Sequence, residues 1–232
     1  MFAPLSAFES EALRLSLLVS LASLTLTVPG GIAAGYLLAR GRFPGKWMLE
    51  TIVNLPLVLP PVVTGLVLLL VFGVNGPVGS VLRETFGLTL AFSWMGAALA
   101  AAVMAFPLVV RPIRLAIESI DQGLEQAAST LGAPPWSVFA HITLPLALPG
   151  LIAGVLLGFA RAFGEFGATV TFAGSIPGET QTLPVAIYTS LQRAQGEPAA
   201  VRLAILSVVV SILALVASEW LNRRVTSGRS AG

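Results

Sequence analysis

The side chains of this chain that could do chemistry are few, and they leave little room for an enzyme. The sequence contains no cysteine and one histidine, His141. Disulfides, thiolate nucleophiles and metal sites built from cysteine or histidine clusters are therefore excluded. His141 lies in the sequence AHITLP, where it is better explained as an interface or helix-end residue than as a catalyst. We expect no catalytic residue and no metal site in this chain.

One segment looks superficially like a phosphate-binding loop. The sequence GRFPGKW at 41–47 has three residues, not four, between Gly41 and Gly45. Trp47 also stands where that motif needs a Ser or Thr to hold Mg²⁺. We interpret the segment as a turn that carries positive charges. No cofactor is therefore expected in this chain, and ATP with magnesium would have to be bound by another one.

Two charged residues stand in an otherwise apolar run. Arg161 and Glu165, in FARAFGEFGATVTFAG, are four residues apart and would share a helix face. Opposite charges at this spacing reduce the cost of placing either one in an apolar environment. The pair could lie beside a pathway for a charged solute, with Thr169 and Thr171 supplying hydroxyl groups. The alternative is a structural clasp, or side chains that reach toward lipid headgroups.

The elements that must position these residues are membrane helices. Of 232 residues 56% are hydrophobic and 10% charged, whereas soluble domains carry roughly 25% charged residues. A membrane-spanning helix needs roughly 20 apolar residues. Such runs lie at 13–39, 47–72, 90–110, 146–172 and 202–221, and a shorter run at 182–191 predicts a surface or re-entrant helix. The sequence therefore predicts an all-α integral membrane protein with five transmembrane helices, forming a single transmembrane domain over 1–232.

The distribution of Lys and Arg predicts the orientation, because cytoplasmic loops carry an excess of these residues. If the first loop faces the cytoplasm, the inside set is Arg40, Arg42, Lys46, Arg111, Arg114, Arg223, Arg224 and Arg229. The outside set is then Arg14, Arg83, Arg193 and Arg202. This excess favours an N-terminus outside and a C-terminus in the cytoplasm. The net charge of +2 therefore reflects topology, and no nucleic-acid partner is expected.

The second expected span contains prolines in the sequence NLPLVLPPVVTG. Proline removes a backbone donor and clashes with the preceding helical turn. In lipid, the freed carbonyl groups must be satisfied by neighbouring helices or by a water-lined cavity. We expect Pro60 and Pro61 to face protein or a translocation pathway, unless the kink only improves packing.

A polar segment at about 118–146 separates the third and fourth spans and carries its own helix signals. Asp121 is a candidate N-cap, and Gly132 can end the helix in the left-handed conformation. Pro134 and Pro135 suit the first turn of a second helix. The apolar residues of the two helices follow at helical spacing: Leu124, Ala127, Ala128 and Leu131, then Trp136, Phe139 and Ile142. Because such short helices are marginal in water, this segment is expected to dock on a partner.

The pattern QAA-x3-G-x9-I-x-L-P in this segment resembles the EAA loop of bacterial ABC importer permeases. The matching residues are Gln126, Ala127, Ala128, Gly132, Ile142, Leu144 and Pro145. In that family the loop forms a coupling helix that fits a cleft in a separate ATP-hydrolysing subunit. The resemblance implies that these residues, together with Glu125 and Trp136, couple the chain to such an ATPase. The family usually has Glu at the first position, whereas this chain has Gln126 with Glu125 one residue earlier.

Further segments closely resemble the permease subunits of bacterial molybdate importers. They are FPGK at 43–46, LPLVLPPVV at 55–63, FSW at 92–94, FPLVVRPIRLAIE from 106, and the run from 161 to 192. The resemblance implies a MetI-like permease core in the bacterial inner membrane, surrounded by lipid. It also implies a homodimer that forms one pore, two ATPase subunits inside, and an extracytoplasmic binding protein that delivers molybdate or tungstate.

Other functions remain open at this stage. Sulfate and thiosulfate permeases share GEFG and the loop, although they generally carry an additional N-terminal span. An ion-coupled carrier would often show inverted repeats and ionisable residues at mid-membrane, and this sequence shows no convincing repeat. An intramembrane enzyme would need a nucleophile and base, or metal ligands, within the spans.

Overall fold

The computed structural model describes the backbone of residues 5–227 and the side chains of residues 5–216, and every regular element in that part of the chain is a helix. Helix α1 (Ala7–Arg40) begins at Ser6, whose hydroxyl accepts a hydrogen bond from the backbone N–H of Glu9. The Glu9 side chain accepts the N–H of Ser6 in return. This reciprocal cap explains why the helix starts six residues before the expected span.

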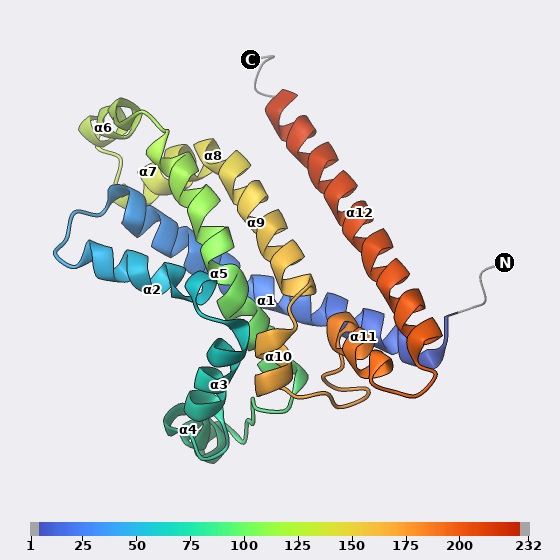
Figure 1. Cartoon of the computed structure of the whole chain (residues 1–232). Coiled ribbons are helices and arrows are strands. Elements are labelled where there is room, and N and C mark those ends of the chain that lie inside the picture. The colour runs from blue at the N-terminus through green and yellow to red at the C-terminus, as the bar shows by residue number, and fades with distance from the viewer. Residues whose placement is uncertain (1–4, 228–232) are drawn as a thin grey trace.

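Helix α5 (Trp94–Glu118) lies at the centre of the molecule, between α1 and α9 (Leu148–Phe163) (Figure 1). Its most apolar stretch is 67% buried, compared with 28% for α1. Small residues make this packing possible. A Cβ on Gly31 would come within 2.7 Å of Val109, and one on Gly154 within 2.8 Å of the Val109 carbonyl oxygen. The third expected span is thus present but runs on to residue 118.

The second expected span is two helices. Helices α2 (Lys46–Val58) and α3 (Pro61–Phe72) are bent by 115° relative to one another, a sharper break than the expected kink, and together they are long and apolar enough for one broken span. Leu59 and Pro60 are extended, with ψ of 140° and 135°. Two successive prolines explain the break, since neither has a donor to continue the helix and Pro61 disfavours helical geometry at Pro60. Helix α4 (Pro77–Phe86), which sequence analysis did not predict, follows α3.

The fourth expected span is also interrupted. Helix α9 ends at Phe163, and the short helix α10 (Gly167–Phe172) follows a three-residue break. Glu165 therefore lies between helices, and the prediction that it shares a helix with Arg161 was wrong. At its other end α9 bends by 69° from the preceding helical segment.

The C-terminal part consists of α11 (Leu183–Leu191) and α12 (Glu197–Ser227). The short helix expected at 182–191 is present, but it does not lie on the surface. Leu183 and Ala186 are fully buried and pack with Ala12, Phe163 and Leu203. Helix α12 extends beyond the expected fifth span at both ends. Arg229 and the side chains of Arg223 and Arg224, which belong to the expected inside set, lie outside the described part.

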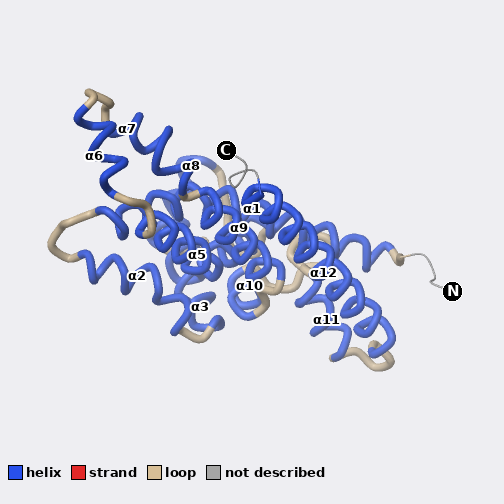
Figure 2. The backbone as a smooth tube through the Cα atoms, turned by 90° about the horizontal axis from the view of Figure 1, so that it is seen from above, coloured by secondary structure: helices blue, strands red, loops and turns tan. Residues whose placement is uncertain are grey.

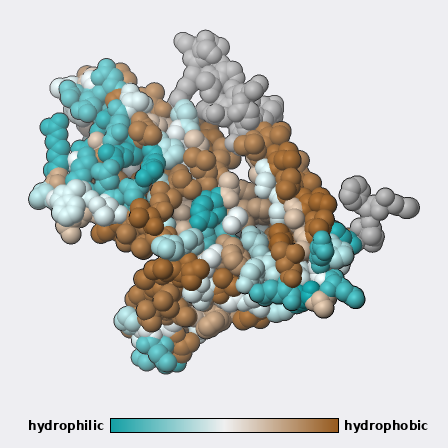
Figure 3. All heavy atoms as spheres, viewed as in Figure 1, coloured by the Kyte–Doolittle hydropathy of each residue, from teal (hydrophilic) through white to brown (hydrophobic). Residues whose placement is uncertain are grey.

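The polar segment forms a hairpin that projects from one end of the molecule (Figures 1 and 2). It contains α6 (Gln122–Thr130), α7 (Pro135–Val138), the π-helix η1 (Phe139–Thr143) and α8 (Leu144–Leu146). We call residues 118–146 the hairpin. In Figure 3 hydrophilic residues gather at this end and near α11, with hydrophobic residues between.

By length and composition, three of the described helices could cross a membrane: α1, α5 and α12. The number rises to five if each of the two bent pairs forms one span. The second of these pairs joins residues 135–146 of the hairpin to α9 and is not the expected span 146–172, so the count of five spans stays a prediction.

Candidate functional site

The hairpin is built by local capping interactions that the sequence predicts. The Asp121 carboxylate accepts the N–H of Gly123 at 2.8 Å and begins α6. Gly132 has φ of +88°, and its N–H bonds to the carbonyl of Ser129, while the N–H of Ala133 bonds to that of Ala128. These two bonds define a Schellman motif, which satisfies the last carbonyls of a helix. Asp121 as N-cap and Gly132 as the left-handed end of α6 are confirmed.

The outer surface of the hairpin carries large exposed apolar side chains, although it lies at a hydrophilic end of the molecule. Leu131 is 89% exposed, Trp136 70% and Leu124 50%. Ala127 is exposed and Ala128 half-buried, so a small-residue surface lies next to these large side chains. Apolar groups of this size that cluster at a polar end of a protein mark an interaction surface.

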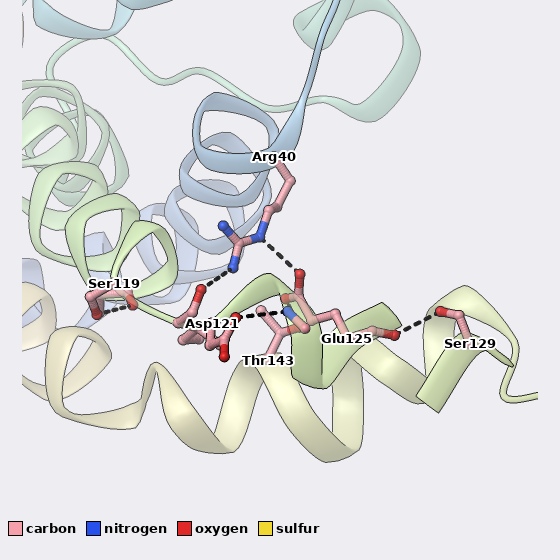
Figure 4. A network of polar contacts seen from close by, with 9 residues as sticks. Arg40, Ser119, Asp121, Glu125, Ser129 and Thr143 are labelled. Atoms are coloured by element: carbon pink, nitrogen blue, oxygen red, sulfur yellow. Dashed lines mark hydrogen bonds and ion pairs between the residues drawn. The ribbon is translucent and has the colours of Figure 1, made fainter. Parts of the chain in front are cut away.

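The inner side of the hairpin is held to α1 by a charged network, shown in Figure 4. The Arg40 Nε lies 3.0 Å from Glu125 Oε2, and its Nη2 donates to the Ile120 carbonyl at 3.0 Å. The Thr143 hydroxyl donates to the other Glu125 oxygen at 2.7 Å. Glu125 is therefore bonded within the chain, whereas Gln126, one residue later, is exposed.

Arg40 and Thr143 belong to this site, and no sequence pattern predicted them. Arg40 is separated from Glu125 by 85 positions, and nothing local to either residue indicates the pairing. The place of Arg40 in the last turn of α1 was a usable signal, because cations are favourable at a helix C-terminus.

Other residues of the expected coupling set lie in the second half of the hairpin. Ile142, Leu144 and Pro145 belong to η1 and α8, where the Leu144 N–H bonds to the Phe139 carbonyl. This five-residue spacing is a π-helical bulge, a feature that often occurs at functional sites. The second helix was expected to be regular, and the bulge was not predicted.

Further polar contacts near the hairpin join α2 to α5. Arg114 bonds to Glu50 at 2.6 Å and to Glu118 at 2.7 Å, and Arg111 bonds to Asn54 at 2.8 Å. Arg111 and Arg114, two basic residues of the expected inside set, therefore lie at the same end of the molecule as the hairpin. They tie the first arm of the broken α2–α3 pair to the central helix.

Arg161 and Glu165 form an ion pair, as their spacing indicated. The Glu165 side chain is 1% exposed and that of Arg161 is 26% exposed. The second Glu165 oxygen accepts the Ala168 N–H at 2.8 Å, in the first turn of α10. The carboxylate thus neutralises Arg161 and also satisfies a donor at a helix start, where negative charge is favourable.

The remaining expected pathway residues gather where α3 and α10 meet. Pro60 is exposed and Pro61 is half-buried, and a Cβ on Gly167 would lie 2.8 Å from Pro61. Thr169 is 1% exposed, and the Thr171 hydroxyl donates to the Gly167 carbonyl. The structure brings Pro61, Glu165 and the two threonines into one region, with Thr169 buried in the conformation described.

The fold and the hairpin are those of a transport permease. Residues 28–227 match the model of the family described as binding-protein-dependent transport system inner membrane component. The chain belongs to this family and is a multi-pass inner-membrane protein.

Within the family, the chain is similar to permease proteins of molybdenum and sulfate transport systems. The chain is 55% identical to the molybdenum transport system permease protein ModB of Escherichia coli strain K12, over 93% of this chain and 94% of that protein. It is 52% identical to ModB of Haemophilus influenzae over the same shares. It is 41% identical to the sulfate transport system permease protein CysW of Synechococcus elongatus, over 88% of this chain and 72% of that protein.

Two solved structures share the fold. A bacterial ABC transporter involved in alginate import matches with a TM-score of 0.76 and 20% identity, over 96% of this chain and 81% of the other. The inward-facing methionine transporter MetNI matches with a TM-score of 0.68 and 19% identity, over 94% of both chains. The expected MetI-like permease fold is thus confirmed.

Proposed function

We propose that this chain is the pore-forming permease subunit of an ATP-driven importer that carries molybdate into the cytoplasm. The observation that carries the proposal is the 55% identity to a molybdenum permease over 93% of the chain. The sulfate permease is more distant, at 41% identity, so the sulfate alternative is not favoured. Tungstate has the same charge and shape as molybdate and is expected to share its route.

In this proposal the exposed apolar surface of the hairpin docks on a separate ATPase subunit. Leu131, Trp136 and the small surface of Ala127 and Ala128 would fill a cleft in that subunit and lose contact with water. The ATPase subunit would bind ATP and Mg²⁺. The present chain would transmit its movement to the membrane helices.

The proposed assembly contains two copies of this chain, two ATPase subunits, and a binding protein that delivers the anion from outside. The N-terminus lies outside and the C-terminus in the cytoplasm, so the hairpin faces the ATPase. Arg161, Glu165, Thr169, Thr171, Pro60 and Pro61 lie beside the translocation pathway. The Arg161–Glu165 pair supports this placement, because it keeps a buried carboxylate from repelling a passing anion.

Uptake by the reconstituted complex tests the substrate. Vesicles that hold the permease, its ATPase and its binding protein are supplied with labelled molybdate and ATP. We expect unlabelled tungstate to compete strongly, and sulfate in equal concentration to compete weakly. Stronger competition by sulfate than by tungstate would reject molybdate as the substrate. Uptake by the permease alone, driven by a proton or sodium gradient, would reject the importer itself.

Docking is tested by disrupting the end of α6. Gly132→Pro is incompatible with φ of +88°, because proline fixes φ near about −65°. Ala128→Glu places a charge on the small surface. Both variants should insert in the membrane normally and lose co-purification with the ATPase.

A matched control comes from α4. Gly87 also ends a helix in the left-handed conformation, with φ of +65°, and lies outside the hairpin. Gly87→Pro should therefore damage a helix end equally and leave ATPase association unchanged. Retained association in Gly132→Pro and Ala128→Glu would contradict the docking role.

A further inference from the structure

Helix α6 has little hydrophobic attachment to the rest of the molecule. It packs against α7 and η1, which belong to the same hairpin. All nine of its residues are described, and none of them is buried. Apolar packing therefore contributes little to holding α6 against the membrane helices, and polar contacts are the direct connection between them.

The charged network described above supplies that connection. Arg40 donates hydrogen bonds from two guanidinium nitrogens, one to the Glu125 carboxylate in α6 and one to the Ile120 carbonyl after α5. Its side chain is 12% exposed and that of Glu125 is 16% exposed, so water screens the pair much less than it would a surface pair. Thr143 holds the other carboxylate oxygen and is itself 1% exposed. The Arg40 side chain thus contacts two parts of the chain, and Glu125 links it to a third through Thr143.

A second contact comes from the same face of α1. Tyr36 lies one turn before Arg40, and residues four apart share a helix face. Its ring packs edge-on against that of Phe139 in η1, with ring centroids 5.1 Å apart. Helix α1 therefore contacts both halves of the hairpin: α6 through an ion pair and η1 through an aromatic contact.

We propose that Arg40 is a positioning residue that latches the hairpin to the cytoplasmic end of α1, so that movement of a docked ATPase reaches α1 directly. We call Arg40, Glu125 and Thr143 the latch. This inference rests on the proposed function, since it needs an ATPase that moves the hairpin. Helix α1 packs against α5, α9 and α11. A movement of α1 at Arg40 would therefore also move the helices of the core.

The test measures transport and ATP hydrolysis separately in the full reconstituted complex. Arg40→Gln and Glu125→Gln both remove the charge pair; Glu125→Gln keeps the size of the side chain, and Arg40→Gln leaves a shorter polar one. We expect both variants to retain ATPase association, while molybdate moved per ATP hydrolysed falls roughly tenfold, a size typical of coupling between sites. The double variant should be no worse than either single one, because both changes break the same interaction.

Two further variants separate a latch from a general structural effect. Arg40→Lys keeps the charge, but an ammonium group cannot bond two targets as a planar guanidinium does. Its molybdate moved per ATP hydrolysed should therefore lie between the values for Arg40→Gln and the unmodified protein. Arg42→Gln removes an exposed Arg two residues later and should leave the ratio unchanged. Hydrogen exchange on the nucleotide-free complex should show faster exchange in 122–130 for Arg40→Gln and not for Arg42→Gln.

The outcomes distinguish the latch from the proposed function. Unchanged transport per ATP in Arg40→Gln, or effects that add in the double variant, would overturn the latch alone. Loss of ATPase association in Arg40→Gln would also overturn it, since the residue would then be needed for docking. If Gly132→Pro keeps both association and uptake, the docking proposal itself fails, whatever Arg40 does.

Discussion

At the scale of single residues, charge neutralisation decides how this chain tolerates polar groups among apolar helices. Glu165 is nearly fully buried and makes an ion pair with Arg161. Glu9 is also buried and pairs with Arg202 at 2.9 Å, which joins the start of α1 to α12. In both cases removal of the cation would leave a buried carboxylate, which costs more than the pair itself contributes.

This asymmetry gives a prediction for the Arg161–Glu165 pair. Arg161→Ala should lower the free energy of unfolding by about 2 kcal/mol, less than for a fully buried pair because Arg161 is partly exposed. Adding Glu165→Gln should recover most of that loss, since the amide oxygen can still accept the Ala168 N–H. Thermal unfolding in detergent measures both, with the exposed Arg83→Ala as control. A double variant less stable than Arg161→Ala would show that the carboxylate is not the cause.

At the scale of elements, glycines set how closely the central helices approach. Gly154 and Gly158 on α9 both face Val109 of α5, and added Cβ atoms would lie 2.8 Å from its carbonyl oxygen and 2.5 Å from a side-chain methyl. Small residues at helix contacts in membranes allow backbones to pack together without a hydrophobic driving force. The α5–α9 interface therefore depends on the absence of side chains at these positions.

Gly154→Ala should consequently push α9 away from α5. The obstacle is backbone, which cannot rotate away, so we expect a loss of about 1–3 kcal/mol in unfolding free energy. Gly164→Ala is the matched control, because its Cβ would lie an ordinary 3.6 Å from the Ala160 carbonyl oxygen. Thermal unfolding of the two purified variants provides the comparison. Equal unfolding temperatures would mean that the interface can relax.

At the scale of the whole molecule, polar groups are segregated to its ends. The hairpin, the end of α1 and the Arg114 contacts lie together at one end, and the Glu9–Arg202 pair joins the start of α1 to α12. Segregation of this kind leaves an apolar middle that fits a membrane, while the orientation with the hairpin in the cytoplasm stays a prediction.

The orientation can be measured with introduced thiols, because the natural chain has no cysteine. Thr85→Cys, at the exposed end of α4, should react with a membrane-impermeant maleimide in right-side-out vesicles. Ser129→Cys, on the exposed side of α6, should react only after the membrane is permeabilised. The opposite pattern would invert the topology and place the hairpin where no ATPase can reach it.

The features that could be predicted from sequence depend on neighbouring residues. The apolar composition determined a membrane protein, and the α6 caps followed from Asp121 and Gly132, because capping is decided within a few residues. The pairing of Arg161 with Glu165 was predicted from their closeness in sequence, although the shared helix used in that argument is absent. The family resemblance rested on contiguous motifs of the same kind.

Only the tertiary structure decided which distant groups meet. The 115° bend between α2 and α3 depends on the helices that α3 packs against as well as on the prolines, and the burial of α11 depends on α1 and α12. The contact of Arg40 with Glu125 joins residues 85 positions apart. A local sequence pattern cannot predict such a contact. The energy of the contact depends on a distance between two side chains that is set only when the helices pack.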